Sequence, residues 1–140
     1  MTIINFTISV PTTGATDIVN ISDEVDQCLS KARPAQGFIH LFVPGATAAL
    51  TTLEYEQGAI ADLQQAIERL APRDMPYEHN RRWGDGNGYA HVRSALLGPG
   101  LTIPVVNGSM HLGTWQQIVL CDFDNHPRNR EILVQIYAEA

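Results

Sequence analysis

Short apolar runs, broken by glycine, proline and asparagine, are the feature that most restricts what this chain can fold into. The first run alternates apolar with polar residues, and its apolar members are Ile4, Phe6, Ile8 and Val10. This period of two is typical of a strand with one buried face. Further strands are predicted by the apolar runs at residues 37–43, 48–54, 115–123 and 132–137. The Asn107-Gly108 dipeptide favours a hairpin within residues 101–113.

Two to three helices are predicted between these strands. The first covers residues 22–32, because Ser22 is a good N-cap residue. A second ends before Pro72, and its apolar stripe consists of Ile60, Leu63, Ile67 and Leu70. A third covers residues 87–97, and its expected buried residues are Tyr89, Val92 and Leu96. Strands around a few helices indicate one compact α+β domain over residues 1–140, built largely on antiparallel sheet.

Charge and composition restrict the partners of the chain. The formal net charge is −6 and only nine residues are Lys or Arg, so generic binding to nucleic acid is not expected. The sequence has no apolar stretch approaching the ~18 residues of a membrane span, so no membrane association is expected. Cys28 and Cys121 are far apart, and the N-terminus has no signal-peptide pattern. These features predict a soluble protein in the reducing cytoplasm.

A long loop with a glycine-rich end precedes the third predicted helix. Residues 72–88 form this loop, and loops of that length in compact domains are usually functional or disordered. Gly84, Gly86 and Gly88 lie at its end, where free N–H groups at a helix start can bind phosphate or carboxylate. Gly86, Gly88 and the nearby Arg82 are therefore candidate ligand-binding residues. The alternative is a tight irregular turn without a ligand.

His79 and His91 are the candidate catalytic histidines. Asn87 and His91 are four residues apart on the predicted helix, so they project from one face, and Asn87 is a further candidate for ligand binding. His79 would converge with His91 if the loop folds over the helix start. Imidazole pairs bind metal ions, and single imidazoles act as acids or bases near neutral pH. The alternatives are a structural role for His91 and a solvated His79.

Glu54 and Asp62 are the candidate catalytic acids. Glu54 ends a predicted strand, a position from which a carboxylate can serve a cleft as a base or a magnesium ligand. Asp62 lies at the edge of a helical apolar stripe, and its alternative is a solvated helix face. Gln116 places an amide at a strand end and is a candidate ligand-binding residue. Trp115 beside it is expected to fill the core.

Three other polar residues are expected at the surface. His111 follows the predicted hairpin, and a surface or subunit-contact role is expected for it. Arg128 and Arg130 lie in a loop before the last strand. Arginines in such a loop are usually solvated, although they can clamp an anion.

Three segments of the chain match one family in combination. They are VPGATAALTTLEYE, LAPRDMPYEHNRRWGDGNGYAHVRSALLGPGLTIPV and LGTWQQIVLCDFDNHPRNREILVQI. In this order they resemble the YjbQ-type family, whose members are known as secondary thiamine-phosphate synthase enzymes. The likeness runs from about Gly37 to the C-terminus.

The resemblance implies a compact α+β fold, a homotrimer, and a site near the subunit boundaries lined by histidines and acids. It also implies that a divalent metal ion, Mg²⁺ or Zn²⁺, is compatible with that site, with His79 and His91 as its ligands. Matched position by position, the family's site residues fall on Glu54, Asp62, His79, Gly86, Asn87 and His91. One position departs from the family: many members have His-Thr-Thr-Ala where this chain has Gly45-Ala-Thr-Ala48.

Two hypotheses follow for the function. The first is a small-molecule enzyme for a phosphorylated or anionic metabolite, resembling enzymes that join a pyrimidine diphosphate to a thiazole phosphate and release pyrophosphate. The second is a non-catalytic homotrimer that binds a metal ion or a small anion through His79 and His91. The histidine missing at Gly45 removes a ligand or acid–base group, so the substrate of this chain need not be that of the family.

Overall fold

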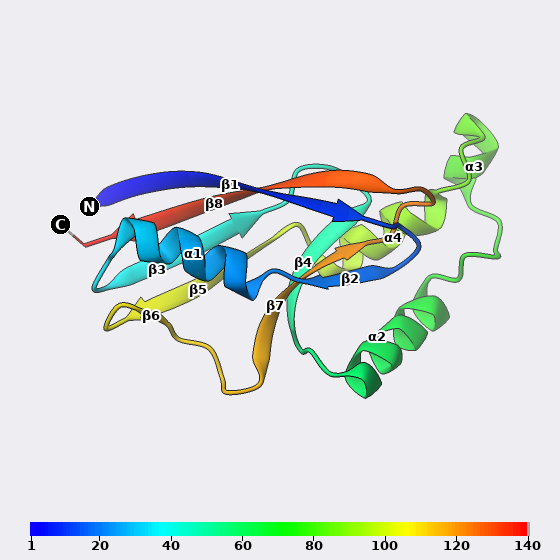
Figure 1. The fold of residues 1–140 in the computed structure, drawn as a ribbon. Coiled ribbons are helices and arrows are strands. Elements are labelled where there is room, and N and C mark those ends of the chain that lie inside the picture. The colour runs from blue at the N-terminus through cyan, green and yellow to red at the C-terminus, as the bar shows by residue number, and fades with distance from the viewer. Residues whose placement is uncertain (140) are drawn as a thin grey trace.

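The computed structural model describes residues 1–139 and contains two antiparallel sheets with four helices (Figure 1). The larger sheet has, in spatial order, β1 (Thr2–Thr12), β8 (Arg128–Ala138), β3 (Gly37–Phe42), β5 (Gly100–Val106) and β6 (Ser109–Met110). The smaller sheet has, in spatial order, β2 (Asp17–Asn20), β7 (Gln116–Asp122) and β4 (Ala48–Glu54). The α+β class and the antiparallel sheet expected from the sequence are confirmed.

The alternating first strand pairs with the last strand of the chain. In this pairing Thr2 lies opposite Ala138 and Thr12 lies opposite Arg128. Ile8 and Val10 of β1 are buried, whereas Ser9 between them is exposed. One face of β1 therefore covers the core, as the period of two predicted.

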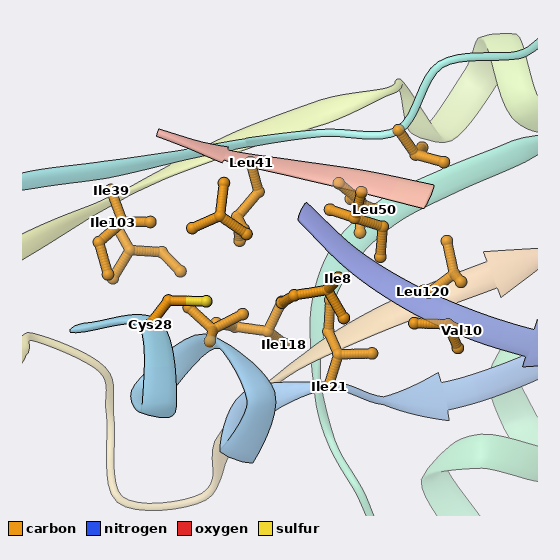
Figure 2. Packing of buried hydrophobic residues seen from close by; sticks show 14 of the residues in the cluster. Ile8, Val10, Ile21, Cys28, Ile39, Leu41, Leu50, Ile103, Ile118 and Leu120 are labelled. Atoms are coloured by element: carbon orange, nitrogen blue, oxygen red, sulfur yellow. The ribbon is translucent and has the colours of Figure 1, made fainter. Parts of the chain in front are cut away.

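The smaller sheet is buried on both faces. On one face Ile118 and Leu120 of β7 pack with the larger sheet and with helix α1 (Ser22–Ala32), and Figure 2 shows these side chains in the same cluster as Ile21 and Cys28. On the other face Val119 packs with residues of the later helices. An apolar run without alternation is typical of a strand covered on both sides.

Three helices follow β4: α2 (Gln57–Leu70), α3 (Glu78–Trp83) and α4 (Gly88–Leu97). Figure 1 shows α2 and α4 beside the smaller sheet, with α3 projecting at the edge of the molecule. In the described residues, no helix is both long and apolar enough to span a membrane.

Five predictions are wrong: one concerns a loop, and four concern side chains that were expected to be buried. The loop expected over 72–88 contains α3. Val92 and Leu96, expected to be buried, are 40% and 61% exposed, because α4 buries Arg93 instead. The guanidinium of Arg93 lies over the Tyr89 ring, 4.8 Å from its centroid, and pairs with Glu68. A stripe of apolar residues therefore does not identify the buried face of a helix when that face contains an arginine paired with an acid.

Two large side chains that were expected to pack inward, Leu70 and Trp115, are also exposed.

Candidate functional site

The two candidate histidines meet where α3 turns into α4. The ring centroids of His79 and His91 are 4.3 Å apart, and the ring planes are tilted by 42°. His79 lies in the first turn of α3 and His91 in the first turn of α4. The convergence predicted from the sequence is therefore confirmed, although a short helix rather than a loop carries His79.

Glycines make the reversal between the two helices possible. Gly84 ends α3 with a φ of 71°, and Gly86 has the same φ, in the left-handed region that favours glycine. Gly88 has a different role, because a Cβ added there would lie 2.6 Å from the Cβ of Tyr77. Its amide also donates to Oδ1 of Asn80, at 2.9 Å. This N–H group, expected to be free for an anion, is thus used within the protein.

Polar atoms beside the histidines have no hydrogen-bond partner. Among residues 1–139, Nδ1 of His79 and Oδ1 of Asn87 are both buried and lack one. Oδ1 of Asp85 lies 3.3 Å from Nδ1 of His79, but not in hydrogen-bonding geometry. Buried polar atoms are nearly always paired in native proteins. These two atoms are therefore candidates for contact with a ligand.

Asp124, which the sequence did not single out, anchors the start of α4. Its side chain is fully buried, and its Oδ1 accepts hydrogen bonds from Nδ2 of Asn87 at 3.4 Å and from the amide of Asn125 at 2.8 Å. Its Oδ2 accepts hydrogen bonds from the hydroxyl of Thr47 at 3.1 Å and from Nε of Arg128 at 3.0 Å. Asp124 thus links the start of α4 to Thr47 and to Arg128 at the start of β8.

Asp122 forms a second buried ion pair beside it. Nε and Nη2 of Arg130 donate to the two carboxylate oxygens of Asp122, at 2.7 and 2.9 Å, and the Thr12 hydroxyl donates at 2.6 Å. Arg130 is only 8% exposed, so the solvated arginine expected at this position is wrong. The sequence did contain a signal: Asp122 and Asp124 are two residues apart, as are Arg128 and Arg130. In extended backbone that spacing places each pair on one face.

Gly45, the position that departs from the family pattern, lies next to the ion pair of Asp122 and Arg130. A Cβ added at Gly45 would be 3.2 Å from Nη1 of Arg130. Nη2 of the same arginine donates to the Thr47 hydroxyl, at 2.7 Å. Gly45, the position at which the resemblance implies a histidine, therefore lies in the same polar network as Asp124 and Asn87.

Because of this network, the free energy of unfolding is expected to depend on pH in the acidic range. Burial by itself raises the pKa of the Asp124 carboxyl. The hydrogen bonds that it accepts, first from the Asn125 amide and then from Arg128, outweigh burial and lower the pKa to about 2. Burial likewise raises the pKa of Asp122, but Arg130 and Thr12 outweigh it, and the pKa is lowered.

Because the folded pKa of Asp124 lies below its unfolded value of 3.8, the folded state binds fewer protons in acid. We expect Asp124 to contribute about 2 kcal/mol above about pH 4, and to lose this contribution as the pH falls towards about 2. Urea unfolding measured over this range checks the expectation. The Asp124→Asn variant should lose less stability on acidification, and an unchanged pH dependence in that variant would count against the assignment.

The other predicted site residues lie elsewhere in the chain. Glu54 pairs with Gln116 at the end of β4 and β7 opposite to the Ala48–Asp122 pair. Six residues of strand separate Ala48 from Glu54, which corresponds to about 20 Å. The β4 end that holds Ala48 contacts α4, because the hydroxyl of Ser94 donates to its carbonyl. Glu54 and Gln116 are therefore remote from the histidine pair of the same chain.

Asp62 and Arg82 are exposed residues on helices. Asp62 lies on α2, and Arg82 lies in the last turn of α3, the helix that also carries His79. Within residues 1–139, no group of three or more His, Cys, Asp and Glu side chains is arranged to hold a metal ion. His79 and His91 supply two imidazoles, so an ion held there would need further ligands from a substrate or from another subunit.

The fold and this site define a small α+β protein with two antiparallel sheets and a polar cluster at the start of one helix. A family model described as UPF0047 protein YjbQ-like matches residues 6–139, and the chain belongs to this family. A UPF0047 protein of Archaeoglobus fulgidus is 35% identical over 85% of this chain and 90% of its own length. The UPF0047 protein YugU of Bacillus subtilis is 31% identical over 93% of this chain and 96% of its own length.

Solved structures show the same fold. A YbjQ-like protein of unknown function from Sulfolobus solfataricus has a TM-score of 0.88, at 29% identity, over 99% of this chain and all of its own. A hypothetical protein from Aeropyrum pernix has a TM-score of 0.90, also at 29% identity, over 96% of this chain and 98% of its own. The arrangement of the two sheets is therefore shared within the family.

Proposed function

We propose that this protein is a small-molecule enzyme that acts on a phosphorylated or anionic metabolite at the histidine pair. The observation that carries the proposal is the contact between His79 and His91, 4.3 Å apart, next to the unpartnered Oδ1 of Asn87. Imidazole exchanges protons near neutral pH, and such transfers contribute about 10²- to 10⁴-fold to rates. Arg82 on α3 would supply positive charge for the anion.

We propose the reaction that the family resemblance implies. In it a pyrimidine diphosphate is joined to a thiazole phosphate, and pyrophosphate leaves. One histidine would protonate or deprotonate a reacting group, and Asn87 would orient the substrate through its free oxygen. A divalent ion, Mg²⁺ or Zn²⁺, would neutralise charge on the diphosphate when bound. His79 and His91 are the residues of this chain that would hold it.

We further propose that the site is completed in a homotrimer. Glu54 lies about 20 Å along β4 from the histidine end, so Glu54 would reach a histidine pair only from a neighbouring chain. Val92 and Leu96 support a subunit contact, because they expose apolar surface on the helix that carries His91. Light scattering of the purified protein gives the subunit number.

A pyrophosphate-release assay tests the enzyme proposal. We expect release from the two phosphorylated substrates above the rate without protein, and a lower rate after treatment with a chelator. The control omits the thiazole phosphate, which should remove release by transfer while leaving any hydrolysis visible. No turnover with any phosphorylated metabolite, together with stoichiometric tight metal, would overturn the proposal.

Tight metal binding without any turnover would favour the second candidate function, a non-catalytic binding protein. The observation on its side is the distance of Glu54 from the histidine pair, together with the exposed position of Asp62. In that case the trimer would bind a metal ion or a small anion through His79 and His91 without converting it.

A further inference from the structure

A second cavity, remote from the histidine pair, lies between the two sheets. Its volume is about 350 Å³, which falls within the range of small-molecule sites. It is bounded by β4, by β5 and by the segment that connects β6 to β7, and its polar lining includes Thr51, Thr52, Thr102, His111 and Gln116. The proposed enzymatic function does not use this cavity.

The outer edge of β4 and the part of the β5 edge that precedes its pairing with β6 border the cavity. β4 is the outer strand of the smaller sheet, and its Leu50 amide donates away from β7, to the Gly98 carbonyl at 3.1 Å. Alternate residues of a strand direct their backbone groups to the same side, so the N–H and C=O of Thr52 also point away from β7. On β5 the Pro104 carbonyl accepts from the amide of His111, at 2.8 Å, so Thr102 directs its N–H and C=O outward in the same way.

Hydrogen bonds hold the polar side chains of the cavity in place. Nε2 of Gln116 donates to the Thr52 hydroxyl at 3.0 Å, and Oε1 of Gln116 accepts from the Gly113 amide at 3.0 Å. The Thr102 hydroxyl lies 3.0 Å from Nδ1 of His40. Groups fixed before binding lose little conformational entropy when a ligand arrives.

The cavity offers no fixed charge to an anion, because His111 is the one titratable side chain among the described residues that line it. None of the described residues that line it is Asp, Glu, Lys or Arg. Leu97, the last residue of α4, is part of the lining, and the C-terminal end of a helix carries partial negative charge. Placing a phosphate or a carboxylate there without a cation would cost free energy.

We propose that this cavity binds an uncharged planar heterocycle that carries neighbouring hydrogen-bond donor and acceptor groups. The N–H and C=O of Thr52 or of Thr102 match such a donor–acceptor edge. Leu97, Leu101 and Leu112, which are only partly buried, provide apolar surface for the ring. An extended peptide does not fit, because His111 in the β6–β7 connection and Gln116 at the start of β7 also bound the cavity.

Nicotinamide and nicotinate together test the proposal. They share the pyridine ring, but nicotinamide carries an uncharged amide where nicotinate carries a charged carboxylate. Binding to the full chain is followed by ligand-observed NMR titration, with hypoxanthine as a second uncharged probe. We expect saturable nicotinamide binding at millimolar concentration, and weaker binding of nicotinate. Equal or tighter nicotinate binding, or no binding of either uncharged probe, overturns the proposal.

Substitutions of residues that line the cavity test whether nicotinamide binds there. Thr102→Val and Gln116→Leu each remove polar groups from the cavity and should weaken nicotinamide binding about 3- to 10-fold. Thr7→Val is the matched control, because Thr7 is an exposed strand threonine on β1, outside the cavity. His91→Ala should leave nicotinamide binding unchanged, which separates this site from the proposed catalytic one. Binding that survives both cavity variants unchanged would contradict the assignment.

Discussion

Replacing Arg130 with methionine is expected to lower the free energy of unfolding by about 3–5 kcal/mol, the usual cost of leaving a buried charge without its partner. Arg130 makes two hydrogen bonds to Asp122, and both side chains are almost fully buried. In the variant, Asp122 would keep the Thr12 hydroxyl and the Asp124 amide as partners, but no cation in direct contact. Urea unfolding at neutral pH measures the loss.

A double-mutant cycle separates the ion pair from packing. Asp122→Asn together with Arg130→Met should cost less than the sum of the two single changes, because neither charge is then left alone. Asp26→Asn is the surface control, since Asp26 is exposed on α1, and it should change stability by no more than about 0.5 kcal/mol. A loss below about 1 kcal/mol in Arg130→Met, or strict additivity in the cycle, would show that the pair does not stabilise the fold as argued.

Replacing His91 with alanine is expected to lower the rate of pyrophosphate release about 10²- to 10⁴-fold while the protein stays folded. The imidazole of His91 lies against that of His79, so the substitution removes one member of the proposed acid–base pair. Stability should change little, because His91 is only half-buried. Its ring makes no hydrogen bond within residues 1–139, and alanine favours helices.

The matched control for His91→Ala is Gln65→Ala, a side-chain truncation on helix α2. Gln65 is exposed and lies outside the proposed site and subunit contact, so its replacement should alter neither the rate nor the fold. Circular dichroism and light scattering establish that each variant is folded and keeps the subunit number of the parent protein. A His91→Ala protein with the parent rate would remove the histidine pair from the mechanism, even if transfer itself is observed.

Local patterns in the sequence carried enough information for most of the sheet. The alternation at Ile8 and Val10 marks a strand with one buried face, and the run through Val119 marks a strand buried on both. Only β2, with four residues, was missed, because so short a strand has too few residues to show a period. The sequence also singled out His79 and His91, but it left their convergence conditional on how the loop folds, and the structure supplied that contact.

Contacts between segments far apart in the chain were not visible in the same patterns. Leu96 was expected to be buried but is exposed. Arg93, which the sequence did not single out, is buried instead, because Glu68 on another helix neutralises it. Trp115 was expected in the core but is 72% exposed. Asp124 was overlooked for the same reason as Arg93. A buried charge is stable only beside its partner, and the partner is known only once the chain is folded.

The sequence by itself determined the class of fold, the family and the two candidate histidines, because strand periods, glycine turns and motif order are local properties of the chain. Only the tertiary structure decided that Asp124 anchors the start of α4 through Asn87, that Asp122 pairs with Arg130, and that Glu54 lies at the opposite end of β4. It also revealed the uncharged cavity between β4 and β5, whose walls come from segments more than forty residues apart in the chain. Such an arrangement depends on how the two sheets pack, and no local pattern records that packing.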